Sequence, residues 1–175
     1  MAGIWCVIFD APIRVYGILD GLQRIPGKMK AIFLDIDGVL NGMLAPSPMH
    51  WNSTSPDCIE CLNEIIDATG AKVFMISSWV DDVYFVGNNP KLEQFLYDRG
   101  VRQGSIVGFR RQGAKKEEGI MELVQAHQDL DSFIIIDDNP TILTNEYMKT
   151  RYLQTESLDG LTKENVQTAI QMLSE

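Results

Sequence analysis

Short apolar runs alternate with amphipathic stretches from residue 31 to the end of the chain. Runs rich in β-branched and aromatic residues are typical of strands, and apolar residues spaced three and four apart are typical of helices. The predicted strands are 31–36, 72–76, 105–109, 132–136 and 152–153, and the predicted helices are 55–70, 89–100, 115–128 and a last one after Thr162. This alternation predicts an α/β fold, a doubly wound, Rossmann-like three-layer sandwich with a mainly parallel central sheet.

Local signals mark the ends of the first predicted helix. Ser55 followed by Pro56 predicts its start, because proline suits the first helical position, and Gly70 predicts its end, because glycine readily adopts the left-handed conformation. Cys58 and Cys61 share an apolar face of this helix. A zinc site would need further Cys or His residues at suitable spacing, so we expect both cysteines in the core.

Composition narrows the class of protein. The 175 residues suit one domain with a sizeable core, and 45% of them are hydrophobic. The net charge of −9 argues against a protein that coats nucleic acid generally, because phosphate contacts need a basic surface. No apolar run reaches the length of a membrane span, and the first residues lack the basic start of a signal peptide. Three cysteines cannot build a disulfide framework, so we expect a cytoplasmic protein without membrane partners.

Residues 1–28 stand apart from the alternating pattern, which makes 29–175 the predicted domain. The segment could form a β-hairpin that adds to the sheet or to a partner chain, and an oligomer could then form through it. It could equally be an upstream extension. The sequence leaves both interpretations open.

Polar residues follow the predicted strands at four places. These places are Asp35 to Gly38, Ser77-Ser78, Lys115-Lys116 and Asp137-Asp138, of which the lysine pair begins a helix. Parallel strands bring their carboxyl ends to one edge of a sheet, where ligands bind. Carboxylates packed together there would repel one another, and a divalent cation would relieve the repulsion. Oxygen ligands without His or Cys favour Mg²⁺ over zinc.

In their order and strand context, these motifs resemble the haloacid dehalogenase (HAD) superfamily of phosphatases and phosphotransferases. The likeness extends over roughly residues 30–174. The string from Ile76 to Trp79 and the tail from Gly160 to Thr162 most resemble the capless group named for the HAD domain of Swiss Army knife RNA-repair proteins.

The resemblance assigns a catalytic role to each motif. Asp35 would be the nucleophile that attacks phosphorus, and Asp37 would protonate the leaving oxygen and then activate water. Ser77 would donate a hydrogen bond to the phosphoryl oxygens. Lys116, or alternatively Lys115, would neutralise the charge on nucleophile and phosphate. Phosphoryl transfer needs mainly positioning and charge stabilisation, which these groups can supply.

The resemblance also implies a Mg²⁺ site. Asp137 and Asp138 would hold the ion directly or through water. The carboxylate of Asp35 and the backbone carbonyl of Asp37 would complete the set of ligands.

The substrate-binding candidates are Ser78, Lys115, Trp79, Arg110 and Arg111. The capless relatives often carry arginine after the Ser-Trp pair, where this chain has Val80, so Arg110 or Arg111 could replace that arginine or could form a solvated face. Trp79 could stack on a base of the substrate or simply cover the edge of the core.

The spacing of the motifs leaves no room for a large cap domain. Loop 41–54 can form a flap, and 79–114 has room for one helix and one short strand. By analogy with the family, an open site favours bulky phosphate esters such as a nucleotide or a nucleic-acid end. We expect a Mg²⁺-dependent phosphomonoester hydrolase that acts through an aspartyl-phosphate. The alternatives are a catalytically silent HAD-fold binding protein and a receiver-like phospho-signalling module, although the motif order fits HAD enzymes better than receivers.

Overall fold

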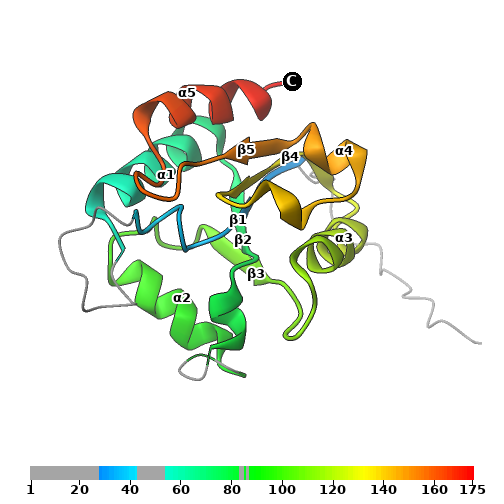
Figure 1. Ribbon diagram of the computed structural model, residues 1–175, viewed down its shortest axis with the longest axis horizontal. Helices are drawn as coiled ribbons and strands as arrows, with labels where there is room; N and C mark the ends of the chain where they lie inside the picture. The colour runs from blue at the N-terminus through cyan, green and yellow to red at the C-terminus, as the bar shows by residue number, and fades with distance from the viewer. Residues whose placement is uncertain (1–27, 43–53, 83–84, 86) are drawn as a thin grey trace, which may run out of the picture.

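The central sheet has five strands, all parallel, in the order β3-β2-β1-β4-β5 (Figure 1). The structure is a computed structural model and describes residues 28–42, 54–82, 85 and 87–175. The strands are β1 (Met29–Leu34), β2 (Lys72–Met75), β3 (Ile106–Phe109), β4 (Leu130–Asp137) and β5 (Tyr152–Gln154). The predicted fold class is confirmed. The ends of each predicted strand differ from those of the observed strand by at most two residues.

Helices connect successive strands. They are α1 (Pro56–Thr69), α2 (Asn89–Tyr97), α3 (Lys116–Ala126), α4 (Glu146–Lys149) and α5 (Lys163–Met172), with two short 3-10 turns, η1 (Ser78–Asp81) and η2 (Pro140–Ile142). Gly70 ends α1 in the left-handed conformation with φ 69°, as predicted. Thr162 caps α5 through a capping box with Asn165. The sequence pattern did not predict α4, η1 or η2, because elements this short show no hydrophobic periodicity.

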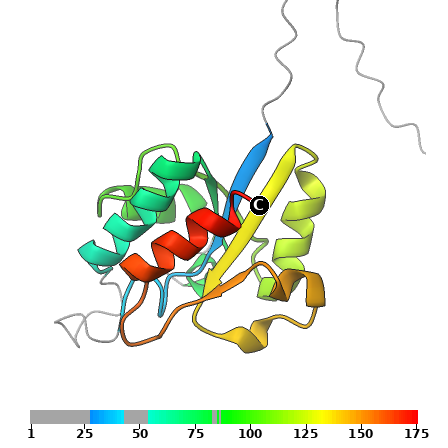
Figure 2. The ribbon, with the colours of Figure 1, turned by 90° about the horizontal axis from the view of Figure 1, so that it is seen from above.

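Alternate residues of the strands face two separate cores. Ile32 and Leu34 of β1 lie in the larger cluster with α1, α2 and α5, whereas Ala31 and Phe33 lie in the smaller cluster with α3 and α4. Figure 2 shows α1 and α5 on one side of β1 and β4, and α3 on the other. This is the predicted three-layer arrangement. In the described residues, the segment between η1 and β3 contains only one α-helix, consistent with the absence of a large cap there.

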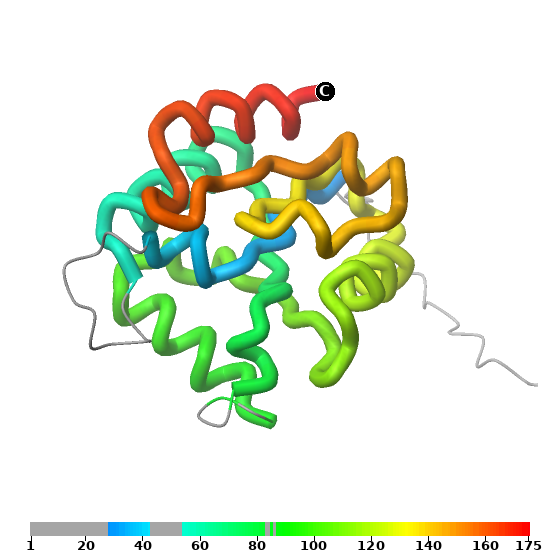
Figure 3. Tube along the Cα trace, viewed as in Figure 1, coloured from blue at the N-terminus to red at the C-terminus, as the bar shows by residue number. Residues whose placement is uncertain are grey.

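The two cysteines of α1 lie in the larger core, as predicted. Cys58 and Cys61 are 2% and 3% exposed. Along the Cα trace, the last helix returns beside α1, so that α5 covers this side of the sheet (Figure 3). No helix among the described residues is long and apolar enough to cross a membrane. The predicted extension 1–28 lies outside the described residues except for Lys28, as does most of loop 41–54.

The topology brings the ends of β1, β2 and β4 together. β1 lies between β2 and β4, and Leu34 is in register with Met75 on one side and Ile136 on the other. The chain winds outward from β1 to β3 and then returns to place β4 on the opposite side of β1. The point between β1 and β4 is therefore a topological switch point, where open α/β sheets bind ligands.

Candidate active site

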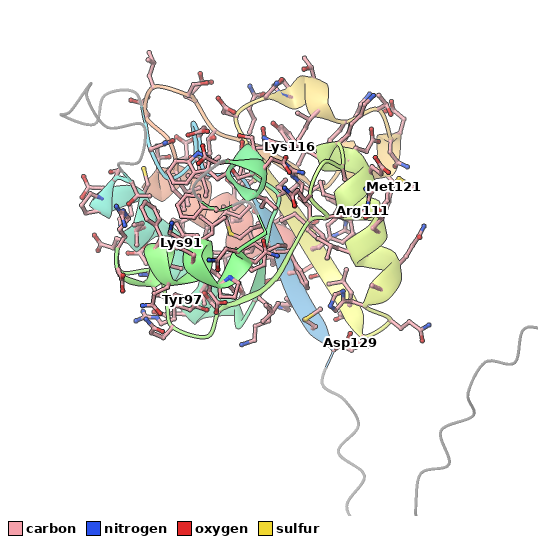
Figure 4. The ribbon with its side chains drawn as sticks, turned by 90° about the horizontal axis from the view of Figure 1, so that it is seen from below. Lys91, Tyr97, Arg111, Lys116, Met121 and Asp129 are labelled. Carbon is pink, nitrogen blue, oxygen red and sulfur yellow. The ribbon has the colours of Figure 1, made fainter. Side chains whose placement is uncertain are left out.

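Lys116 joins the acidic residues at the ends of β1 and β4. Its Nζ donates to Asp35 Oδ2 at 2.5 Å and to Asp137 Oδ2 at 2.7 Å. Lys116 is the first residue of α3, so the start of this helix sets the position of the ammonium group. Figure 4 shows Lys116 and Asp129 at opposite ends of the sheet. Lys115 is exposed, and of the two lysines it is Lys116 that contacts the acids.

Three carboxylates form a compact cluster at this edge of the sheet. Asp35, Asp137 and Asp138 each offer one oxygen, and these oxygens lie within 4.8 Å of one another. Asp35 is 4% exposed, and its Oδ1 is buried without a hydrogen-bond partner among the described residues. A buried oxygen without a partner is costly unless a ligand satisfies it. The oxygen-only donor set fits Mg²⁺.

The electrostatics of the cluster also favour an additional cation. Burial and the charge of Asp35 raise the pKa of Asp137 to about 6, against the opposing effect of Lys116. Burial lowers the pKa of Lys116, but the charges of Asp35 and Asp137 outweigh this effect, and the net shift is upward. Lys116 is therefore cationic, and a single ammonium group does not balance three clustered carboxylates.

Asp138 is positioned by groups that lie far from it in the sequence. Ser157 Oγ donates to Asp138 Oδ2 at 2.5 Å. The carboxylate also lies close to Gly38, where any Cβ would clash with it. Gly38 has φ +69° and its carbonyl accepts from Thr155 Oγ1 at 2.7 Å. Position 38 therefore requires glycine for two reasons, its backbone conformation and the closeness of Asp138.

The carboxylate of Asp37 is turned toward different partners. Its Oδ2 accepts from Trp79 Nε1 at 2.9 Å, and its Oδ1 accepts from Asn41 Nδ2 at 2.8 Å. Asn41 in turn accepts from the backbone N–H of Gly38 at 2.9 Å, which fixes the loop after β1. Asp37 is exposed, and its side chain is not part of the three-carboxylate cluster. Its predicted role as a metal ligand through the backbone carbonyl stays a prediction.

The end of β2 places Ser77 next to this loop. Ser77 is fully buried, and its Oγ accepts from the backbone N–H of Trp79 at 3.3 Å. Ser78 is exposed at the start of η1. The ring of Trp79 is 7% exposed and packs against Phe85 and Phe95, so it covers the edge of the core.

Arg110 and Arg111 have very different surroundings. Arg110 is 4% exposed, and all five of its N–H donors have acceptors. The acceptors are the Asp81 carboxylate and the backbone carbonyls of Ile76, Ser77, Arg111 and Ala114.

Arg111 is exposed and forms ion pairs with Glu118 and Glu122 of α3. The sequence left Arg110 or Arg111 either as a substitute for the missing arginine or as part of a solvated face. In the structure Arg110 is bonded to the loop that carries Ser77, and Arg111 forms surface ion pairs. The pair of identical residue types gave no sign of this difference, which depends on burial. Substrate binding by either arginine stays a prediction.

Sequence reasoning missed several residues that hold the site. Asn41 and Ser157 contact the acids directly, and Tyr152 OH donates to the carbonyl of Asp137 at 2.9 Å. Burial and the nearby carboxylates, Asp137 first among them, raise the pKa of Tyr152. Of these three residues, only Asn41 lies close enough in the sequence to Asp37, four residues away, for a contact to be inferred from local spacing. Ser157 and Tyr152 reach the site through the fold of the β5 region.

A groove of about 1000 Å³ begins beside Lys116, between α3 and the segment after β4. Its lining includes Lys115, Met121, Thr141, Ile142 and Asn145. Glu117 connects the two walls, because its carboxylate accepts from the backbone N–H and hydroxyl of Thr144 and from the backbone N–H of Asn145. These bonds lower the pKa of Glu117 despite the opposing effect of burial.

Comparison with family models assigns this arrangement to a known family. Residues 31–166 match the model of the HAD domain in Swiss Army Knife RNA repair proteins. Searches of curated proteins and of solved structures found no match. The matched segment is most of the chain and includes all four strand-end motifs, from Asp35 to Asp138. The chain therefore belongs to the family of HAD domains found in Swiss Army Knife RNA repair proteins.

Proposed function

We propose that this protein is a Mg²⁺-dependent phosphomonoester hydrolase in which Asp35 is the nucleophile. Family membership indicates a phosphatase-type hydrolase. The observation that carries the finer proposal is the state of the Asp35 carboxylate. One of its oxygens is bound to Lys116, and the other is buried without a hydrogen-bond partner among the described residues. Such an oxygen has lone pairs available to coordinate an ion or to attack phosphorus.

The residues that would hold Mg²⁺ are Asp35, Asp137 and Asp138, with the backbone carbonyl of Asp37 as a further proposed ligand. When bound, the ion would supply positive charge that offsets the repulsion between the carboxylates and an incoming phosphate. The shortage of positive charge around the three clustered carboxylates supports this assignment.

In the proposed first step, an oxygen of Asp35 attacks phosphorus and the bond from phosphorus to the leaving oxygen breaks. Asp37 gives its proton to that oxygen, and the alcohol departs. The Lys116 ammonium, 2.5 Å from Asp35, holds the nucleophile and offsets negative charge. The buried Ser77 hydroxyl would donate to a phosphoryl oxygen.

In the second step, water attacks the phosphorus of the aspartyl-phosphate and gives a proton to Asp37. The bond between phosphorus and Asp35 breaks, which releases phosphate and restores the Asp35 carboxylate and the protonated carboxyl group of Asp37. Atoms and protons balance over the two steps, because Asp37 first gives a proton and then receives one.

The proposed substrate is a bulky phosphate ester, such as a nucleotide or a nucleic-acid end. Two findings support this class. The groove beside Lys116, of about 1000 Å³, has room for a large leaving group, and the matched family belongs to proteins of RNA repair. Lys115 lines the groove and would contact an anionic part of such an ester.

The test is phosphate release from p-nitrophenyl phosphate by wild-type protein and by Asp35→Asn, with Mg²⁺ and with EDTA. A panel of nucleotides, oligonucleotides with 3′ or 5′ phosphates and phosphopeptides would be run beside it. We expect Mg²⁺-dependent release that falls at least about 10³-fold in the variant, because loss of a nucleophile removes the covalent route.

The Asn side chain is nearly the same size, so circular dichroism should show an unchanged fold. If folded, Mg²⁺-binding wild-type protein released phosphate from no ester in the panel, the proposed function would be refuted. A catalytically silent or receiver-like protein would then explain the site better.

A further inference from the structure

The indole N–H of Trp79 is directed at the carboxylate to which we assign proton transfer. Trp79 Nε1 donates to Asp37 Oδ2 at 2.9 Å, and Asn41 Nδ2 donates to Oδ1 at 2.8 Å. With one donor on each oxygen, the plane of the carboxylate is set. Each oxygen keeps a further lone pair on which a proton can reside.

The Trp79 ring packs against two aromatic rings that also contact each other. The ring of Phe85 stacks on it, with centroids 6.0 Å apart and an interplanar angle of 7°. Phe95 meets it edge-on at 5.6 Å. The backbone N–H of Trp79 also donates to Ser77 Oγ at 3.3 Å, so one residue contacts two motifs of the site.

This packing favours one of the two uses of Trp79 that the sequence left open. A ring that stacks on a substrate base must present a free face. The side chain is only 7% exposed, and its neighbours in the core are themselves aromatic. What Trp79 directs into the site is therefore its N–H group, and the acceptor of that group is Asp37.

We propose that Trp79 is a positioning residue for Asp37 and that its N–H bond places the carboxylate for proton transfer to the leaving oxygen. The inference rests on the proposed function, in which Asp37 first gives a proton to the leaving oxygen as its bond to phosphorus breaks. Trp79 itself exchanges no proton and does not contact the phosphate. Without the N–H bond, the carboxylate rotates and the proton reaches the leaving oxygen less often.

The effect of this loss depends on the leaving group. p-Nitrophenolate is a good leaving group and departs readily without a proton. Phenolate is a poorer leaving group, so its departure depends more strongly on protonation. The ratio kcat/KM reports the reaction through departure of the alcohol, before hydrolysis of the aspartyl-phosphate. We therefore compare kcat/KM for p-nitrophenyl phosphate and phenyl phosphate, two esters of similar shape, in wild-type protein and in Trp79→Phe with Mg²⁺.

We expect Trp79→Phe to lower kcat/KM for phenyl phosphate at least about 10-fold more than for p-nitrophenyl phosphate, within the range that positioned acids contribute. Asp37→Asn should show the same selectivity for the better leaving group. Phe85→Leu is the matched control, because it loosens the same aromatic cluster and leaves the N–H group in place. This variant should change kcat/KM for both esters by the same factor.

If Trp79→Phe lowered kcat/KM equally for the two esters, the positioning role alone would be overturned. The same holds if Phe85→Leu showed the same preference for p-nitrophenyl phosphate as Trp79→Phe. Wild-type protein without activity on either ester, or Asp37→Asn without selectivity, would overturn the proposed chemistry and this inference with it. If Trp79→Phe does not fold, benzothienylalanine at position 79 replaces the N–H group by sulfur at similar ring size, and the same comparison applies.

Discussion

The two flanks of Asp35 satisfy their polar groups to very different degrees. On the β4 flank, Lys116 bonds two of the three clustered carboxylates, those of Asp35 and Asp137, and Asp35 Oδ1 has no partner among the described residues. On the flank toward β3, every donor of Arg110 has an acceptor. A complete network serves as scaffold, because it has no bonding capacity left. A ligand or a reaction is expected on the β4 flank, where Asp35 has a buried oxygen without a partner among the described residues and the pKa of Asp137 is raised.

The comparison also separates basic residues that look alike in the sequence. Arg110-Arg111 and Lys115-Lys116 are two basic pairs only a few residues apart. One member of each pair is bonded to interior groups: Arg110 donates to backbone carbonyls, and Lys116 donates to the acids. Arg111 and Lys115 remain exposed.

The largest expected effect on stability tests the scaffold flank. Arg110→Met would remove the bonds that Arg110 donates to four backbone carbonyls and to the Asp81 carboxylate. The carbonyls of Ser77 and Arg111 and the Asp81 carboxylate each keep one other backbone donor. The Asp81 side chain is 37% exposed, so the main cost comes from buried carbonyls that lose a donor. A buried polar group left without its partner costs about 1–3 kcal/mol, so we expect a loss of about 3 kcal/mol in the free energy of unfolding. Urea denaturation followed by circular dichroism measures it.

Arg111→Met is the matched control, because this side chain is exposed and its ion pairs with Glu118 and Glu122 are on the surface. Its urea midpoint should stay close to that of the wild type. Similar urea midpoints for the two variants would contradict the role of Arg110 as a stabilising part of the fold.

A smaller effect is expected from Gly38→Ala on the acidic flank, with Gly70→Ala as control. Both glycines have φ +69°, but a Cβ at Gly70 meets nothing within 4 Å, whereas at Gly38 it meets the Asp138 carboxylate. Each variant should lose about 1–2 kcal/mol of unfolding free energy from the left-handed backbone.

Only Gly38→Ala should also weaken Mg²⁺ binding, because Asp138 must move. Isothermal titration with Mg²⁺ distinguishes the two variants. Equal Mg²⁺ affinity in both would remove Asp138 from the proposed ion site.

The smallest predicted effect concerns Ser157. Its hydroxyl orients Asp138 through a bond of 2.5 Å, and partners of this kind typically alter metal affinity by about 10-fold or more. We expect Ser157→Ala to weaken Mg²⁺ binding roughly 10-fold. Wild-type unfolding without Mg²⁺ should be nearly retained, since Asp138 is only half-buried. Unchanged affinity in the titration would show that Gly38 alone positions Asp138.

The fold could be predicted well because its signals are local. Buried parallel strands such as β1 and β4 appear as apolar runs, and Gly70 and Thr162 mark helix ends by their own conformational preferences. The short elements η1, η2 and α4 escaped prediction, since three or four residues give no periodicity. The candidate acids were found because polar residues directly after apolar strands can be recognised in the sequence. Lys116 was assigned through the resemblance to HAD enzymes, with Lys115 as the alternative.

By itself, the sequence determined the α/β class, the strand-end acids and the resemblance to HAD domains, because each depends on residue type and short-range spacing. Only the tertiary structure decided which residues hold the site in place. Whether an arginine binds buried carbonyls or surface carboxylates depends on burial and on contacts between distant segments. The same is true of the bond from the Trp79 N–H group to Asp37 and of the contact between Ser157 and Asp138. Those contacts form when the sheet brings β1, β2, β4 and β5 to one edge, which no local pattern encodes.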